Sequence, residues 1–469
     1  MDKTRAKQIG IFGATAIVAG NMMGSGIALL PANLAAIGSI SVIGWAIAGA
    51  GALALAFVYA KLGTEDPQQG GPIAYAGEVA PILGYQTGVL YFNANWIGNL
   101  AIAITGVDYL SVFLPFLSDP IPGGIASIAV VWVFTGINLL GAGWISRLVS
   151  IGVILLLIPV VLTGTVGWFF FDSAQFSENW NVGHQGNVSA ILASIILCIW
   201  AFIGVESSSV NADLVKNPHR TVPTSTMLGT CIAGAVYVLS CTAMSGMFPA
   251  AEVAKSGAPF SLAAGHMFGD WAPKVVSAVV AFACLASLGS WMMLVSQAGA
   301  RGAKDGTLPK IFGRENKKGI PAAGIILSSV MMSILMVILM LISKGGNTAT
   351  LFGNIASIAV LLTLPAYFYS ALHLLNLHGF RSRKGVIPVI ASLAASVFCF
   401  IALGGASRWF LAAAMIIMFA VFIFYSGKDR TEYARKVTAK YHAPKGEPDA
   451  AATPSADSGP GTGADSAAS

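Results

Sequence analysis

The chain has 469 residues, of which 56% are hydrophobic and only 10% are charged. Soluble domains carry roughly 25% charged residues, so this composition excludes an ordinary soluble protein and indicates a polytopic membrane protein. The formal net charge of +6 calls for no nucleic-acid partner, because cationic loops facing anionic lipid account for it.

Apolar stretches of about 20 residues recur along almost the whole chain, and each is long enough to cross roughly 30 Å of hydrocarbon as a helix. The pattern predicts an all-α polytopic membrane protein with about twelve transmembrane helices. The predicted spans are residues 9–36, 40–62, 84–114, 123–141, 147–169, 188–212, 223–248, 275–300, 321–343, 350–375, 386–405 and 408–427. Residues 1–427 therefore form the predicted membrane domain, and residues 428–469 form a C-terminal tail.

The basic residues predict the orientation of the chain. With an even number of spans both termini lie on one side, and all but four of the 26 lysines and arginines fall on that side. The exceptions are Lys255, Lys274, Lys344 and Arg408. Because cytoplasmic loops are enriched in positive charge, both termini are predicted to be cytoplasmic. The first span begins after only about eight residues and is too long for a signal-peptide core, so we expect the mature protein to keep it.

The sequence contains no pattern of a metal site, a disulfide framework or a catalytic centre, and we predict no cofactor. Five cysteines lie inside predicted spans without a CxxC pair, which predicts free thiols packed as small apolar groups. The six histidines fall near or beyond span ends, with no HExxH motif and no close acid pair. The tail after residue 446 lacks aromatic residues and is predicted to be disordered and cytoplasmic.

The first span contains three glycines within seven residues, Gly20, Gly24 and Gly26. Glycine costs about 1 kcal/mol in a helix interior, so the cluster needs a reason. One reason is close helix packing through Gly20 and Gly24. The other is an unwound segment at Gly24-Ser25-Gly26, whose freed N–H groups can bind a carboxylate.

The sixth span carries a single acid, Glu206, after Trp200 and Gly204 in an otherwise uncharged segment. A charge at bilayer depth costs roughly 3 kcal/mol, so such residues usually face a cavity and mark an ion or substrate pathway. The alternative is a carboxylate bonded to a neighbouring helix for packing alone. This second candidate break lies five spans after the first, the offset expected when a five-helix unit is repeated in inverted topology.

The two breaks suggest complementary binding roles. Backbone amides around Ser25 and Gly26 would hold a carboxylate, whereas the acidic segment around Gly204 and Glu206 would favour an amine. The predicted substrate is therefore a zwitterionic or cationic amino acid.

Three motifs resemble those of the basic amino acid/polyamine antiporters of the amino acid–polyamine–organocation superfamily. They are GNMMGSGI at 20–27, WAFIGVES at 200–207 and KNPHRTVP at 216–223, and the resemblance extends over about residues 8–425. It implies a five-plus-five inverted repeat with broken helices 1 and 6 plus two extra helices, location in the cell (inner) membrane, and a homodimer. It also implies exchange of an amino acid for its decarboxylated amine.

Two further motifs, QQGGPIAYAGE at 68–78 and ANWIGNLAI at 94–102, are similar to those of members that exchange lysine for cadaverine. The implied function is exchange of extracellular lysine for intracellular cadaverine, supporting acid resistance together with a cytoplasmic lysine decarboxylase. The alternatives are ornithine/putrescine or arginine/agmatine exchange, or a non-transporting amino acid sensor on the same scaffold. Ile73 stands where arginine/agmatine members carry a tyrosine, and Asn95 replaces a small thiol.

The resemblance places carboxylate binding at Ser25 and Gly26, the two walls of the bound chain at Trp200 and Trp291, and a proton- or amine-responsive group at Glu206. A lone tryptophan in a span is otherwise most often an interfacial anchor. The predicted substrate-binding residues are Asn21, Ser25, Gly26, Tyr91, Asn95, Asn99, Trp200, Ile203, Glu206 and Trp291.

Four-residue spacing places Tyr91, Asn95 and Asn99 on one face of the third span. For the two asparagines, hydrogen bonding between helices is the alternative to substrate binding. Asp108 and Asp119 lie near the outer end of the same span. Electrostatic attraction of cations is one explanation for them, and we expect the other, a solvated rim.

Overall fold

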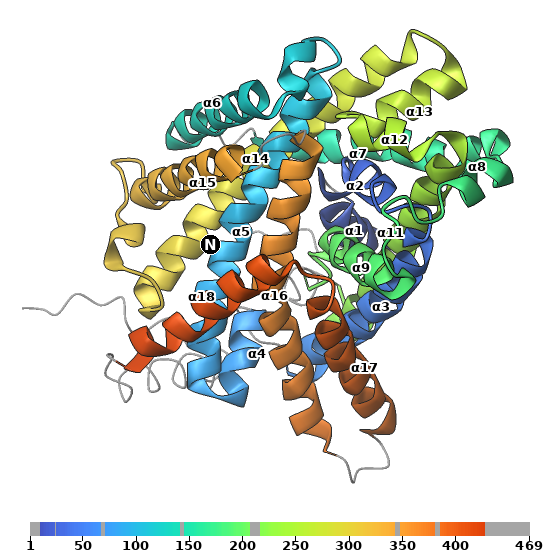
Figure 1. Cartoon of the computed structure of the whole chain (residues 1–469). Helices are drawn as coiled ribbons and strands as arrows, with labels where there is room; N and C mark the ends of the chain where they lie inside the picture. Colours follow the sequence, from blue (N-terminus) through green and yellow to red (C-terminus); the bar gives the residue numbers. More distant parts are fainter. Residues whose placement is uncertain are drawn as a thin grey trace, which may run out of the picture.

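The structure is a computed structural model that describes residues 10–23, 25–66, 71–140, 145–206, 216–342, 348–379 and 385–426. Every regular element in these ranges is a helix (Figure 1), and seven of the helices are long and apolar enough to cross a membrane. These seven are α3 (Ser41–Glu65), α6 (Pro120–Leu139), α11 (Pro218–Met247), α14 (Ala272–Asp305), α15 (Ala322–Ile342), α16 (Thr348–His378) and α17 (Val386–Leu403). The prediction of an all-α polytopic membrane protein is confirmed.

Each of the other predicted spans also contains a helix. They are α1 (Ile11–Met22) with α2 (Leu30–Ala35), α5 (Pro81–Leu110), α7 (Ile145–Thr165), α9 (Asn187–Phe202) and α18 (Arg408–Ser426). The sequence did not predict the short helices between spans, which are α4 (Pro72–Val79), α8 (Ser173–Glu178), α12 (Ala250–Lys255) and α13 (Pro259–Phe268). The total of twelve spans and the inverted repeat stay predictions, and the tail lies outside the described residues.

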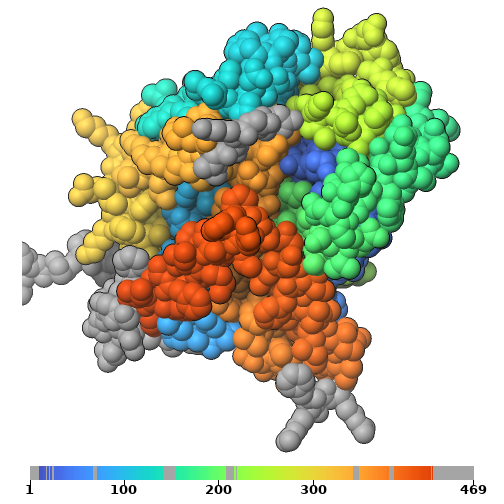
Figure 2. All heavy atoms as spheres, viewed as in Figure 1, coloured from blue at the N-terminus to red at the C-terminus, as the bar shows by residue number. Residues whose placement is uncertain are grey.

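Helices α5 and α16 pass side by side through the centre of the molecule (Figure 1). In α16, 78% of the most apolar stretch is buried, compared with 28% in α6. The surface of α6 is therefore available to lipid, whereas α16 belongs to the core. The C-terminal helices α17 and α18 lie on the outside in Figure 2.

The first span is interrupted, and the helix of the sixth span ends inside the predicted span. Helix α1 ends at Met22, the 3₁₀ turn η1 (Ser25–Ile27) follows, and α2 resumes at Leu30. Helix α9 ends at Phe202, and Gly204 then has a φ of +108°. Residues with a side chain rarely adopt such a φ, so glycine is needed at this turn. The predicted break in the first span is therefore present on both sides of Gly24, which itself lies outside the described residues. The helix of the sixth span ends where a break was predicted, and residues 207–215 lie outside the described part of the chain.

A buried tyrosine hydroxyl binds a backbone carbonyl at each interruption. The Tyr109 hydroxyl of α5 donates to the Ala28 carbonyl at 2.9 Å, and the Tyr237 hydroxyl of α11 donates to the Ala201 carbonyl at 3.1 Å. An unpaired carbonyl at membrane depth costs several kcal/mol, so these bonds stabilise the broken helices. The sequence analysis missed both tyrosines, because their partners are distant in the chain.

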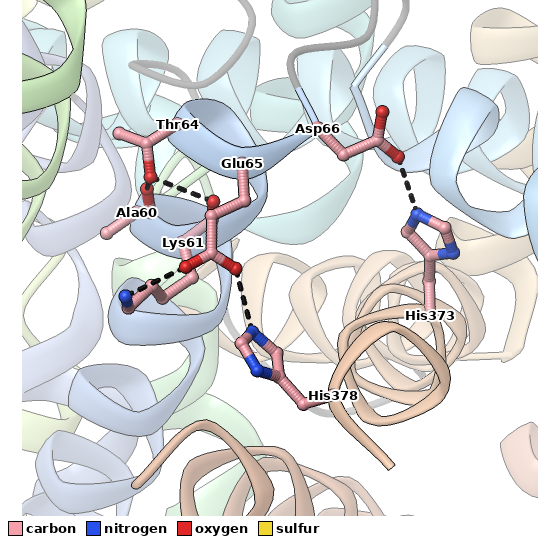
Figure 3. Close-up of polar contacts among 7 residues, drawn as sticks. All are labelled: Ala60, Lys61, Thr64, Glu65, Asp66, His373 and His378. Carbon is pink, nitrogen blue, oxygen red and sulfur yellow. Dashed lines mark hydrogen bonds and ion pairs between the residues drawn. The ribbon is translucent and has the colours of Figure 1, made fainter. Parts of the chain in front are cut away.

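The ends of α3 and α16 are joined by two histidine–acid contacts (Figure 3). His373 Nε2 lies 2.8 Å from Asp66 Oδ2, and His378 Nε2 lies 2.7 Å from Glu65 Oε2. Lys61 Nζ also contacts Glu65 Oε1 at 2.9 Å. No pattern along the sequence indicated these contacts, because each pair joins residues more than 300 positions apart.

The five cysteines are free, as predicted. Four of them are buried, but Cys231 is exposed on the outer face of α11. The expectation that every thiol is packed inside the protein is therefore wrong for Cys231.

Candidate functional site

A cavity of about 70 Å³, lined mostly by apolar atoms with a few polar groups, lies where the interrupted first span and the end of α9 meet α5, α14 and α16. Seven of the ten predicted site residues line it, namely Gly26, Tyr91, Asn95, Asn99, Trp200, Ile203 and Trp291. Met22, Ala94, Gly98, Ile102 and Thr363 complete the lining and were not predicted. The side chains of Asn21 and Ser25 lie outside the described residues, and Glu206 lies behind the cavity wall.

Helix α5 presents Tyr91, Asn95 and Asn99 to the cavity on one face, as the four-residue spacing predicts. The Asn95 amide donates to the Tyr91 carbonyl of the same helix at 2.6 Å. The Asn99 Nδ2 is buried and makes no hydrogen bond within the described part of the chain. Neither asparagine amide therefore donates a hydrogen bond to another helix in the described part of the chain. The Asn99 amide is free to bind a ligand.

The indole of Trp200 fits between two glycines. A Cβ placed on Gly26 would lie 3.2 Å from its Nε1, and a Cβ on Gly98 would lie 3.2 Å from its Cη2. The Nε1 is buried without a hydrogen-bond partner among the described residues. Trp200 and Trp291 both line this cavity, which favours a binding role over an interfacial anchor. The sequence analysis missed Gly98, because a single helical glycine carries little information without its neighbour.

We expect Gly98→Val to weaken substrate binding without unfolding the protein. The added methyl groups would meet the Trp200 ring and push it into the cavity. Isothermal titration with cadaverine would measure the loss of affinity. Gly136→Val is the matched control, because a Cβ at Gly136 in α6 would meet no atom within 4 Å. An unchanged affinity in Gly98→Val would show that the ring position does not shape the site.

Glu206 is held by three donors and does not face hydrocarbon unpaired. Its Oε1 accepts a hydrogen bond from the Tyr91 hydroxyl at 2.5 Å. Its Oε2 accepts from the Tyr367 hydroxyl at 3.0 Å and from the Gly204 N–H at 3.2 Å. The side chain is buried. Tyr91 lines the cavity, so its hydroxyl connects the cavity to the carboxylate. Tyr367 was not predicted, because α16 lies far away in the sequence.

Buried aromatic rings continue from Glu206 toward the contacts between α3 and α16. The ring of Tyr367 lies 5.9 Å from that of Tyr59, which lies 6.4 Å from that of Tyr75. Tyr75 in turn stacks on His373 at 5.9 Å. The central acid and the histidine–acid contacts therefore belong to one continuously packed column.

Asp108 does not lie in a solvated rim. It is fully buried in α5, whereas Asp119 is exposed as expected. The prediction for Asp108 is wrong because sequence position places a residue near a helix end without showing what packs over it. No group of three His, Cys, Asp or Glu that could hold a metal ion is present in the described residues.

A helical membrane protein whose central cavity lies between an interrupted first span and the end of α9 has the form of a membrane transport protein. Residues 9–431 match the family model described as amino acid permease, and the chain belongs to that family. This membership supports the resemblance noted in the sequence.

Three proteins of known activity are similar to this chain in sequence. The Cadaverine/lysine antiporter of Escherichia coli K12 is 55% identical over 424 residues, which cover 90% of this chain and 95% of that protein. The Putrescine transporter PotE of the same strain is 35% identical, with 79% and 84% covered. The Putrescine transporter PotE of Haemophilus influenzae is 31% identical, with 90% and 97% covered. The chain is therefore a transport protein and not an enzyme.

Proposed function

We propose that this protein exchanges extracellular lysine for intracellular cadaverine. The observation that carries the proposal is the pairing of unsatisfied donors with an acid around one cavity. Trp200 Nε1 and Asn99 Nδ2 have no hydrogen-bond partner among the described residues, and Glu206 lies one hydroxyl behind the wall. The 55% identity to the cadaverine/lysine antiporter supports the same substrates.

Each part of the cavity suits one part of lysine. The opened backbone at η1, beside Trp200 Nε1, suits the α-carboxylate. The indoles of Trp200 and Trp291 suit the methylene chain and an ammonium group, since a desolvated cation–π contact is worth about 2 kcal/mol. Tyr91, backed by Glu206, suits an ammonium at the other end. Cadaverine keeps both amines and loses only the carboxylate, so it can use the same walls.

Counterflow would test the substrate pair. Proteoliposomes preloaded with cadaverine are given labelled lysine, arginine or ornithine in parallel. We expect uptake of lysine well above that of the other two. Preferential uptake of ornithine would instead support an ornithine/putrescine exchanger, in line with the 35% identity to a putrescine transporter. Binding of lysine without uptake would indicate the sensor class.

We expect the exchange to be electrogenic. At neutral pH lysine carries one net positive charge and cadaverine carries two. One-for-one exchange therefore moves one positive charge out of the cell, against about 2.3 kcal/mol per 100 mV of inside-negative potential. In cadaverine-loaded proteoliposomes, an inside-positive clamp should speed lysine entry and an inside-negative clamp should slow it. A rate of lysine uptake that does not change with the clamped voltage would mean that a compensating ion moves with one substrate.

The physiological setting of the exchanger is part of the proposal. A cytoplasmic lysine decarboxylase would consume a proton and supply cadaverine, so that the pair exports acid equivalents and supports acid resistance. The excess of basic residues in the loops on the terminal side supports cytoplasmic termini in the cell (inner) membrane. Protease accessibility of a C-terminal tag in right-side-out and inverted vesicles would test the orientation. Sedimentation in detergent would test the homodimer.

A further inference from the structure

Asp108 is a second buried carboxyl group, and it has no part in the binding site proposed around Glu206. Its side chain is fully buried, and both carboxylate oxygens lack a hydrogen-bond partner among the described residues. The one hydroxyl proton of Thr348 can be donated to this carboxyl group or to the Ser118 carbonyl, which lies 3.4 Å from Thr348 Oγ1. An ionised carboxylate without partners costs several kcal/mol when it is buried, so such a group takes up a proton or a cation.

Asp108 lies beneath a second cavity, here called the vestibule. The vestibule has a volume of about 560 Å³, and its lining includes Ser111, Glu252, Lys255, Gly257 and His266. A Cβ placed on Gly257 would lie 3.5 Å from the Asp108 Cβ and 3.4 Å from its carbonyl oxygen. The segment between α12 and α13 therefore closes over Asp108 and separates it from the vestibule.

Tyr109, the next residue along α5, connects the α12–α13 segment to the interrupted first span. The Tyr109 hydroxyl, which donates to the Ala28 carbonyl, also accepts the N–H of Phe260 at 3.4 Å. Phe260 is the second residue of α13, directly after the segment that covers Asp108. A movement of the α12–α13 segment away from α5 would thus both uncover Asp108 and act on the interrupted first span.

The ionisable groups around Asp108 come from several elements. Tyr109 is on the same helix, and Glu252, Lys255 and His266 line the vestibule from α12 and α13. On α16, the described residues begin at Thr348, which is uncharged. Lys344 lies outside the described residues, so the experiment below includes a cation-paired Asp108 among its outcomes.

We propose that Asp108 is a proton-binding site, protonated while the α12–α13 segment covers it and deprotonated when that segment opens. On opening, the O–H bond of the carboxylic acid breaks, the proton passes to vestibule water, and the carboxylate becomes hydrated. The covered state binds the proton more tightly, so acid on the vestibule side stabilises the covered state. The link between this opening and exchange rests on the proposed antiport function, whereas the protonation itself does not.

Infrared difference spectroscopy tests protonation directly in the full-length protein. We expect wild type at neutral pH to show the carbonyl stretch of a buried carboxylic acid, and Asp108→Asn to lack it. Asp119→Asn is the matched control, because Asp119 is a nearby exposed acid, and it should keep the band. A carboxylate band assigned to Asp108 at neutral pH would mean that it pairs with a cation and would overturn the proposal.

Exchange measured against the pH of the vestibule side tests the coupling. Full coupling to one proton changes the rate by roughly tenfold per pH unit in the titrating range. Asp108→Asn keeps the shape of the residue without its charge, so we expect unchanged thermal stability and a pH response below about twofold. Asp119→Asn should respond like wild type. A wild-type response in Asp108→Asn would overturn the coupling. If wild type moves neither lysine nor cadaverine, the proposed substrates fail, and the infrared result alone decides the proton site.

Discussion

We expect Glu206→Gln to lower the exchange rate by about ten- to hundredfold while the protein stays folded. A hydrogen bond to a charged group is worth about 1.5–3 kcal/mol, and about 1.4 kcal/mol corresponds to tenfold. The carboxylate accepts from two tyrosine hydroxyls and one backbone N–H. A glutamine would turn an NH₂ group toward at least one of these donors and would remove the negative charge behind Tyr91. Initial rates of lysine uptake into cadaverine-loaded proteoliposomes would measure the effect.

Two further variants distinguish the effect of the Glu206 charge from that of the groups that donate hydrogen bonds to it. Glu178→Gln changes an exposed acid at the end of α8 and should exchange like wild type. Tyr367→Phe removes one donor but keeps the ring and the charge, so its loss should be smaller than that of Glu206→Gln. Wild-type rates in purified, folded Glu206→Gln would return this acid to a packing role.

We expect Trp200→Leu and Trp291→Leu each to weaken cadaverine binding by up to about 2 kcal/mol, or roughly thirtyfold. Leucine keeps apolar bulk but removes the π face that attracts an ammonium group. Trp200→Leu also removes the unpaired Nε1 donor, so it should weaken lysine binding more than cadaverine binding. Isothermal titration with both ligands would measure the two affinities.

Trp271→Leu is the control for the aromatic walls, because Trp271 is 65% exposed at the start of α14 and lies outside the cavity. Its affinity for both ligands should match that of wild type. Equal, unchanged affinities in the Trp200 and Trp291 variants would mean that these residues only fill space.

Local patterns in the sequence were sufficient to predict the helical membrane fold and one face of the candidate site, whereas Trp291 was predicted from the family resemblance. Helix formation across lipid depends on the length and polarity of each stretch, and both can be read along the chain. The same holds for the breaks, since Gly26 and Gly204 mark places where a helix interior is unfavourable. The shared face of Tyr91, Asn95 and Asn99 follows from helical periodicity alone.

The partners of these residues were decided only by the tertiary structure. Tyr367 reaches Glu206 across 161 positions, and His373 reaches Asp66 across 307. The burial of Asp108 depends on Gly257 in a distant segment. Hydrogen bonds, burial and the room for the Trp200 ring are properties of atoms that meet in space, and a single sequence does not state which atoms those are. The chain itself thus determined where helices form and break, whereas the packing of α5, α9, α14 and α16 decided what each polar side chain faces.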